Sequence, residues 1–248
     1  MSKDWTKIRA KVKDFIESEI YPKETELAKG TPEAREMLGS LMQLAKDEKI
    51  WALGHPEDIG GGGMPFMEYV YVNEVIGRSS FAMVALGTHS LQDSIMLREF
   101  ASPHWRDQYL EPLVQGEIFP SFGMTEPDVA SSDPTQLQTT AILDNGTWKI
   151  NGTKWFTTGA ARAAYTTVMC RTELDAPSHG AFSMIIVPTD NPGYKIVRET
   201  PVLGINGGHY EVKYDNVEVP EENLLGPRGQ GFIIAQKRLG PGRIFHCM

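Results

Sequence analysis

The spacing of hydrophobic residues changes once along the chain, and this change limits the folds that the chain can adopt. Up to about residue 115, apolar residues recur at the three- and four-residue steps of a helix, as Trp5, Ile8 and Val12 do. We expect Pro22 to end this first helix, because proline has no N–H to donate. Beyond that point the period is two, which is typical of strands. The sequence therefore predicts a helical bundle followed by a β domain.

The helical part contains a clear start signal at Thr31-Pro32-Glu33. It combines a capping hydroxyl, a proline where the N–H is dispensable, and an acid near the positive end of the helix dipole. Further helical patterns cover Phe66–Gly77, Ser90–Phe100 and Pro103–Leu113. We expect these helices to form an N-terminal domain over residues 1–116.

The β part opens with two runs, Gln136–Leu143 and Thr147–Trp155, on either side of Asn145-Gly146. This dipeptide is typical of a tight hairpin turn. Short strands at this spacing favour an antiparallel barrel or sandwich over residues 117–226, and no βαβ repeat is visible. The further predicted strands are Tyr165–Arg171, Phe182–Pro188, Tyr194–Arg198 and Tyr210–Val219.

A third part, residues 227–248, begins as a helix and then stops. Gly231–Leu239 has a helical pattern, Gly240-Pro241-Gly242-Arg243 could start another helix, and Met248 follows without a stop signal. Short helices are marginal without packing partners. We interpret this as the start of a C-terminal helical domain that is missing from this sequence.

Composition excludes several classes of protein. The chain has 248 residues, a net charge of −8 and two cysteines, Cys170 and Cys247. This charge argues against a nucleic-acid partner, and two cysteines form neither a disulfide framework nor a zinc motif. No apolar stretch has the ~18–20 residues of a membrane span. We expect a soluble intracellular protein with no metal site, mitochondrial or peroxisomal in a eukaryote and cytoplasmic in a bacterium.

Two glycine-rich segments resemble nucleotide-binding loops only superficially. Gly60–Gly63 follows no strand and precedes no Gly-Lys-Ser/Thr, so a loop between helices is the better interpretation. Gly226, Gly229 and Gly231 lack the last glycine of a dinucleotide fingerprint, because residue 234 is Ile234. A turn from strand to helix is expected there.

Two polar segments near the junction of the two parts are candidates for binding a ligand. Ser121–Asp133 is rich in hydroxyls and restrained by Pro127, so it offers donors in a fixed frame. Downstream, Trp155–Gly159 ends a predicted strand with an aromatic residue followed by hydroxyls. An indole can pack beside a flat ring whose polar atoms bind the hydroxyls. The residues alone do not separate this role from that of a capped turn.

Three ordered matches make the chain resemble the acyl-CoA dehydrogenase family. They are Met124-Thr125-Glu126-Pro127 with Ser132-Asp133, then Lys154-Trp155-Phe156-Thr157-Thr158-Gly159, then Asp215–Gly226. The family also has the same order of parts, a helical domain, a β domain and a C-terminal four-helix domain. The chain departs from the family motifs in two places: the loop after Pro127 is one residue longer than usual, and Thr158 replaces an asparagine. The longer loop and the Arg238–Arg243 ending are similar to those of family members ten and eleven, which act on long or 4-hydroxylated acyl-CoAs.

The resemblance implies FAD as cofactor and assigns roles to single residues. Thr125, with backbone groups of Phe122 and Met124, would bind the pyrimidine side of the flavin, Thr157 would approach N5, and Trp155 would flank the ring. Ser131 and Ser132 would meet the FAD phosphates or the CoA, and Arg243 a CoA phosphate or the acyl head. The expected cofactor-binding residues are Phe122, Met124, Thr125, Ser131, Ser132, Trp155, Phe156 and Thr157, and the expected substrate-binding residues are Ser132, Gly240, Pro241, Gly242 and Arg243.

The implied reaction is α,β-dehydrogenation of an acyl-CoA thioester, as in fatty-acid β-oxidation. The family's catalytic carboxylate lies in the C-terminal domain, so no catalytic residue is expected here, and Glu126 is expected to support its loop. The implied partners are an electron-transferring flavoprotein and further copies of the full-length protein. Two alternatives stay open: a truncated non-catalytic product that binds acyl-CoA or flavin, and a related flavin oxidase.

Overall fold

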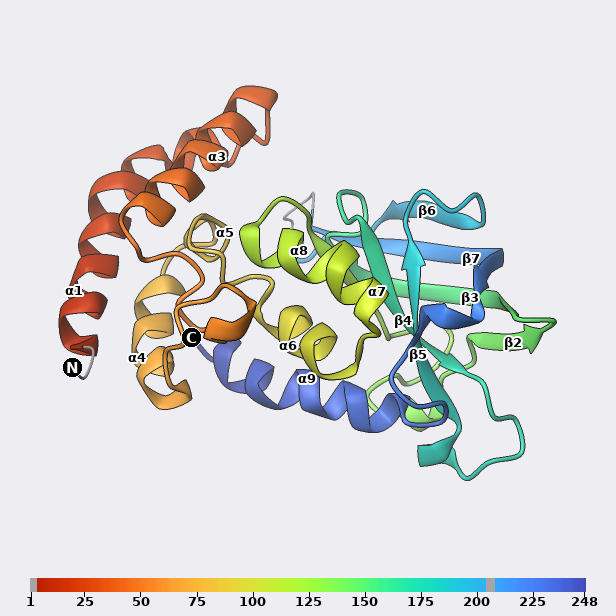
Figure 1. Ribbon diagram of the computed structural model, residues 1–248. Helices are drawn as coiled ribbons and strands as arrows, with labels where there is room; N and C mark the ends of the chain where they lie inside the picture. The colour runs from red at the N-terminus through yellow and green to blue at the C-terminus, as the bar shows by residue number, and fades with distance from the viewer. Residues whose placement is uncertain (1–3, 204–207) are drawn as a thin grey trace. The chain divides into compact units, whose positions relative to one another are not determined.

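The computed structural model describes residues 4–203 and 208–248, which form two compact units (Figure 1). The helical unit comprises the described residues up to 98 together with 108–117 and 238–248. The β unit comprises residues 99–107 and 118–237. The predicted domain boundaries after residues 116 and 226 stay a prediction.

The helical unit is built largely from the segments predicted to be helical (Figure 1). The predicted start of α3 is confirmed, since the Thr31 hydroxyl oxygen accepts the Ala34 N–H at 3.3 Å and Pro32 is the first helical residue. The α-helices that lie wholly or partly in this unit are α1 (Trp5–Phe15), α2 (Glu24–Leu27), α3 (Pro32–Asp47), α4 (Phe66–Ile76), α5 (Ala82–Ala85), α6 (Leu91–Phe100), α8 (Glu111–Gln115) and α9 (Gly231–Phe245).

The expected stop at Pro22 is wrong. Helical structure continues from α1 through a π-helical turn, Ile16–Ile20, and a 3₁₀ turn, Tyr21–Lys23, into α2. The Tyr21 N–H donates to the Ile16 carbonyl five residues back, and Pro22 lies at the start of the next turn, where an N–H is dispensable. The widened turn therefore lets the chain pass the proline without ending the helical segment.

The C-terminal half of α9 packs inside the helical unit. The Phe245 ring contacts Tyr69 of α4 edge to face at 5.2 Å between centroids. Arg238 donates to both carboxylate oxygens of buried Asp93, at 3.1 and 3.0 Å. The expectation that a new helix starts at Gly240-Pro241 is wrong, because α9 runs unbroken through Pro241. Pro241 removes one helical hydrogen bond, but the anchors at Arg238 and Phe245 hold the turns on either side.

The Gly60–Gly63 segment is a loop before α4, as predicted, and its glycines serve close packing. A side chain on Gly61 would lie 2.2 Å from the His55 carbonyl oxygen, and one on Gly62 would lie 2.8 Å from the Leu53 Cα.

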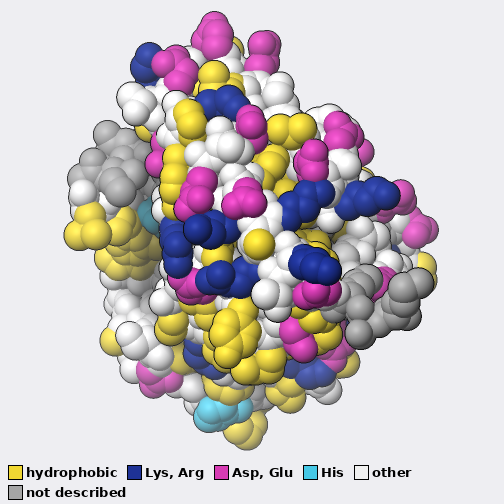
Figure 2. Space-filling view, turned by 90° about the vertical axis from the view of Figure 1, so that its left-hand side faces the viewer, with side chains coloured by type: hydrophobic (Ala, Val, Ile, Leu, Met, Phe, Trp, Pro, Cys, Tyr) yellow, Lys and Arg dark blue, Asp and Glu magenta, His cyan; other side chains and the backbone are white. Residues whose placement is uncertain are grey.

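On the face shown in Figure 2, Lys and Arg side chains lie among Asp and Glu side chains. Surface ion pairs of the helical unit include Lys11–Glu48, at 2.6 Å.

The β unit is one eight-stranded sheet with the order β6-β7-β3-β2-β4-β5-β8, and β1 pairs with β4 (Figure 1). The sheet is mixed: most neighbours are antiparallel, as predicted, but β1 runs parallel to β4, with Pro120 opposite Tyr165. The strands are β1 (Pro120–Gly123), β2 (Thr140–Asp144), β3 (Thr147–Thr158), β4 (Tyr165–Arg171), β5 (Phe182–Pro188), β6 (Tyr194–Glu199), β7 (His209–Pro220) and β8 (Leu224–Leu225). The short helix α7 (Pro103–Trp105) also belongs to this unit.

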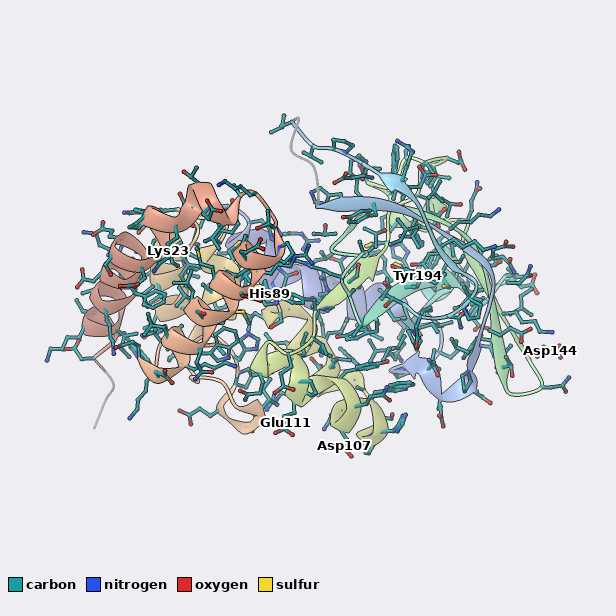
Figure 3. All side chains as sticks on the ribbon, turned by 90° about the horizontal axis from the view of Figure 1, so that it is seen from above. Lys23, His89, Asp107, Glu111, Asp144 and Tyr194 are labelled. Atoms are coloured by element: carbon teal, nitrogen blue, oxygen red, sulfur yellow. The ribbon has the colours of Figure 1, made fainter. Side chains whose placement is uncertain are left out.

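The β2–β3 hairpin forms as predicted around Asn145 and Gly146, whose φ angles of 49° and 78° suit a tight turn. Figure 3 shows Asp144 at the outer tip of this hairpin. Figure 3 also shows Tyr194 within the β unit, where its hydroxyl lies 3.0 Å from the Thr166 hydroxyl. Strands β4 and β5 are buried along almost their whole length and form the core of the sheet.

The predicted start of the first hairpin strand at Gln136 is four residues early. Gln136 ends a 3₁₀ turn, Pro134–Gln136, in which the Asp133 carboxylate accepts the Thr135 N–H at 3.1 Å. The next free amides, of Gln138 and Thr139, bind a side chain instead of a neighbouring strand. The strand therefore begins only at Thr140, which periodicity alone does not reveal.

Candidate functional site

Two of the predicted ligand-binding segments lie side by side in the β unit. The Trp155 N–H donates to the Thr125 carbonyl at 3.0 Å, and the Thr125 hydroxyl donates to the Trp155 carbonyl at 2.9 Å. Nearby, the Ser121 hydroxyl donates to the Thr158 carbonyl at 2.8 Å. These bonds join the loop after β1 to the end of β3, so residues that are 30 apart in sequence form one surface.

A β-bulge reverses the side-chain alternation at the end of β3. The register to β7 shifts between Lys154 and Thr157, and Phe156 takes a φ of 48°, a left-handed conformation that L residues seldom adopt. Phe156 consequently faces outward and is 42% exposed, whereas Thr157 is fully buried. Local strain of this kind costs on the order of 1–3 kcal/mol and is concentrated at functional sites.

Two donors near the bulge have no protein acceptor in the described residues. The buried Thr157 hydroxyl has no hydrogen-bond partner in the structure. Within residues 4–203 and 208–248, no hydrogen bond uses the Thr125 N–H as donor either. Buried polar groups are normally paired, and the Thr157 hydroxyl is one of several buried hydroxyls of the β unit that are not. Together with the indole of Trp155, this donor set fits the polar edge of a flat heterocycle such as a flavin.

The rest of the loop uses its hydroxyls mainly to hold its own shape. The Ser131 hydroxyl accepts the Glu126 N–H at 2.8 Å and donates toward the Glu126 carbonyl at 3.1 Å. Ser132 and Asp133 are exposed. Ser131 therefore supports the loop in this structure. The predicted phosphate or CoA contacts of Ser131 and Ser132 stay a prediction.

A buried ion pair lies beneath these two segments. The Lys154 ammonium is 2.8 Å from a Glu126 carboxylate oxygen and also donates to the Met124 carbonyl at 2.9 Å. The Glu126 carboxylate accepts two backbone N–H groups as well, from Gln138 at 2.7 Å and Thr139 at 2.9 Å. The side chains of Lys154 and Glu126 are 0% and 5% exposed, so the pair is sealed from water.

This bonding prevents Glu126 from acting as a base. Burial alone would raise the pKa of Glu126, but the Lys154 ammonium and the hydrogen bonds outweigh burial and hold that pKa below its usual value. A carboxylate with a lowered pKa and filled acceptor positions is a poor proton acceptor. Burial also raises the pKa of the nearby Cys170 thiol to about 12, so this cysteine is no nucleophile.

The other predicted site residues belong to the helical unit. Gly240, Pro241, Gly242 and Arg243 lie on α9, and Arg243 is exposed. Gly242 is fixed by packing, since a side chain there would lie 2.4 Å from the Gln92 amide nitrogen. The substrate-binding role of these four residues stays a prediction.

The described residues offer no better candidate for a functional site than this surface. A cavity of about 400 Å³ in the β unit is lined by residues that include Trp105, Pro188 and Pro220, and by none of the predicted site residues. Among the described residues, no group of three or more His, Cys, Asp or Glu is arranged to hold a metal ion. In the same part of the chain, no helix is both long enough and apolar enough to cross a membrane.

Comparison with known families decides what this architecture is. Residues 2–117 match the model of the acyl-CoA dehydrogenase N-terminal domain, and residues 121–217 match that of the acyl-CoA dehydrogenase middle domain. The chain belongs to the acyl-CoA dehydrogenase family. The predicted resemblance is thereby confirmed, as is the predicted order of a helical part followed by a β part.

Individual relatives support this assignment. A Mycobacterium tuberculosis protein named "probable acyl-CoA dehydrogenase FadE2" is 41% identical over 97% of this chain and 62% of its own length. Acyl-CoA dehydrogenase family member 10 of Mus musculus is 37% identical over 98% of this chain and 24% of its own length. A solved Mycobacterium abscessus structure described as an acyl-CoA dehydrogenase superposes with a TM-score of 0.91 at 34% identity, covering 99% of this chain and 65% of that chain. The chain thus spans less than two thirds of these relatives.

No role was predicted for Lys154, which lies beneath the candidate site. Its position carried a usable signal, because Trp148, Ile150 and Lys154 fall on the inward-facing positions of β3. A lysine at an inward position must find an acid and further acceptors, since an unpaired buried charge is very costly. Glu126, in the neighbouring motif, is that acid.

Proposed function

We propose that this chain carries the flavin-contacting surface of an FAD-dependent acyl-CoA dehydrogenase, which removes hydrogen from the α and β carbons of an acyl-CoA thioester. Members of the family are flavoproteins. The observation that carries the proposal is the pair of hydrogen bonds between Thr125 and Trp155, which joins the two partly exposed segments while the Thr125 N–H donates to no acceptor in the described residues.

Each residue of this surface has a defined task. The Thr125 N–H and the Thr157 hydroxyl would donate to polar atoms of the flavin, and the Trp155 indole would cover the ring and exclude water. Because the Thr125 hydroxyl already donates to the Trp155 carbonyl, it would face the flavin as an acceptor. When bound, FAD would supply the hydride-accepting ring, and fixed donors near it stabilise the charge that it gains.

The base for the α proton has to come from outside the residues of this surface. Glu126, the buried carboxylate nearest the loop, is committed to Lys154 and to two backbone amides. In the family the base lies in the C-terminal domain. This same observation favours a second candidate for the 248 residues alone, namely a product that binds flavin or acyl-CoA without catalysing the reaction.

Titration with FAD tests the proposal. We expect saturable quenching of flavin fluorescence by the chain, weakened in Thr157→Val and unchanged in Thr153→Val, a matched control on the same strand. Absence of saturable binding to the unmodified chain would refute the flavin site. Anaerobic addition of a long-chain acyl-CoA to the FAD-loaded chain then separates the two candidates. Bleaching of the flavin indicates dehydrogenation, and a spectral shift without bleaching indicates binding alone.

We extend the proposal to the substrate and the electron acceptor. The resemblance of the longer loop and of the Arg238–Arg243 segment to family members ten and eleven supports a long-chain or 4-hydroxylated acyl-CoA as substrate. We propose an electron-transferring flavoprotein as acceptor, in an enzyme that is a homo-oligomer when full length. A related flavin oxidase would instead release hydrogen peroxide, so peroxide yield during turnover distinguishes the two. The mitochondrial, peroxisomal or cytoplasmic location stays a prediction.

A further inference from the structure

The ammonium group of Lys154 binds the backbone of the proposed flavin loop as well as an acid. One contact is the Glu126 carboxylate at 2.8 Å, and the other is the Met124 carbonyl at 2.9 Å. The stem of Lys154 passes close beneath the end of β1, because a side chain on Gly123 would lie 3.4 Å from the Lys154 Cγ. Lys154 therefore holds the first peptide of the loop from the inside of the sheet.

The direction of this contact fixes the direction of the next N–H. The peptide between Met124 and Thr125 is trans, and the carbonyl and N–H of a trans peptide point in opposite directions. Lys154, with no exposed surface, draws the Met124 carbonyl into the core. The Thr125 N–H must consequently point away from the core, and within the described residues it donates to no protein acceptor.

The Glu126 carboxylate is the second acceptor of the Lys154 ammonium, separate from the Met124 carbonyl. This carboxylate is itself held by the N–H groups of Gln138 and Thr139, and these ordinary amides define where the carboxylate can lie. The ammonium is thus located between a fixed acid and the Met124 carbonyl. A buried lysine needs such partners to remain charged.

We propose that Lys154 is a positioning residue for the flavin: by binding the Met124 carbonyl, it aims the Thr125 N–H at the pyrimidine edge of the ring. This inference rests on the flavin site proposed above. It gives the ion pair a role in cofactor binding that a purely structural pair does not have. The two roles differ in what they predict when each partner is removed separately.

Two variants separate these roles. Glu126→Gln removes the acid but leaves Lys154 able to bind the Met124 carbonyl. The double variant Lys154→Met with Glu126→Gln removes both charges and also the Met124 contact. Because Glu126→Gln leaves a buried ammonium poorly compensated, it is the less stable of the two in urea unfolding. A structural role predicts weaker FAD binding in the less stable variant, whereas a positioning role predicts the reverse order.

We expect FAD to bind Glu126→Gln within about twofold of the unmodified chain and the double variant about tenfold more weakly, the loss of one hydrogen bond. The midpoint potential of FAD bound to the double variant should become more negative, because one donor to the reduced ring is lost. Lys149→Met is the matched control, since Lys149 lies on the same strand but pairs with Asp144 at 2.9 Å on the surface.

The outcomes distinguish failure of this inference from failure of the flavin site. If the unmodified chain binds no FAD, the flavin site fails and the positioning role fails with it. If the unmodified chain binds FAD but the double variant has the same affinity and potential, only the positioning role is overturned. A tenfold loss of affinity in Glu126→Gln would overturn it as well, and would do so even if the double variant did not fold.

Discussion

Acidification is expected to destabilise the helical unit through one buried histidine. His55 is 1% exposed, its Nε2 lies 2.9 Å from the Gly87 carbonyl, and its Nδ1 lies 2.8 Å from the Ser94 hydroxyl. Because a carbonyl can only accept, Nε2 carries the hydrogen, and Nδ1 shares the single hydrogen of the Ser94 hydroxyl with the Leu91 carbonyl, which lies 2.9 Å from that hydroxyl. Burial lowers the pKa of His55 to about 4, although the Gly87 hydrogen bond acts in the opposite direction.

The size of the effect follows from the two pKa values. The pKa of His55 is about 4 in the folded chain against the ordinary histidine value of 6.5. Between these values the unfolded chain binds more protons, so the free energy of unfolding falls as the pH falls. The contribution is complete above the unfolded value and is lost on the way down to about pH 4. One pKa unit corresponds to about 1.4 kcal/mol, so lowering the pH from about 7 to about 5 should cost about 2 kcal/mol.

Urea unfolding, followed by the helical circular dichroism signal over this pH range, measures this loss. His55→Gln should be less stable at neutral pH because the buried network is broken, but this component of the pH dependence should disappear. His104→Gln, which removes an exposed histidine, serves as the control and should keep the slope of the unmodified chain. An equal slope in His55→Gln and the unmodified chain would refute the assignment to His55.

Three further changes have defined outcomes. Glu126→Gln should lower the free energy of unfolding by about 3–5 kcal/mol, because the buried Lys154 ammonium loses its partner, and chemical denaturation measures this. Thr157→Val removes a hydroxyl that has no partner, so the free energy of unfolding without FAD, measured by thermal unfolding, should change by no more than about 1 kcal/mol. The affinity for FAD should fall. A large loss of stability would contradict the binding role. Trp148→Ala removes a side chain with 0% exposure and should cost about 3–5 kcal/mol by denaturant titration, and a loss below about 1 kcal/mol would show that the core is not centred there.

Local signals in the sequence predicted the local structures well. The helix cap at Thr31 and the turn at Asn145-Gly146 depend on the local conformation of these residues alone. A helix start and a hairpin turn could therefore be placed from a few residues. The predicted end of the first helix at Pro22 was wrong because a π-helical turn in the preceding residues lets the helical segment continue past the proline. Such a turn has no short sequence signature.

Long-range features could not be predicted in the same way. A two-residue period indicates a strand but not the direction of its neighbour, so the parallel pairing of β1 with β4 was not foreseen. The residues of the candidate site could be recognised in the sequence, but the contacts that hold them in place could not. Lys154 and Thr139 acquire their roles only when Glu126 brings them together from separate elements.

The parallel pairing of β1 with β4 also determines when the proposed site can form during synthesis. Pro120–Gly123 finds its partner only in Tyr165–Val168, after the whole β2–β3 hairpin has been made. Closing so long a loop is slow compared with forming a hairpin. A nascent chain released before residue 165 would have the loop and Trp155 but not the strand that pairs with β1. Ribosome-bound chains should therefore acquire the ability to bind FAD only after β4 has left the exit tunnel.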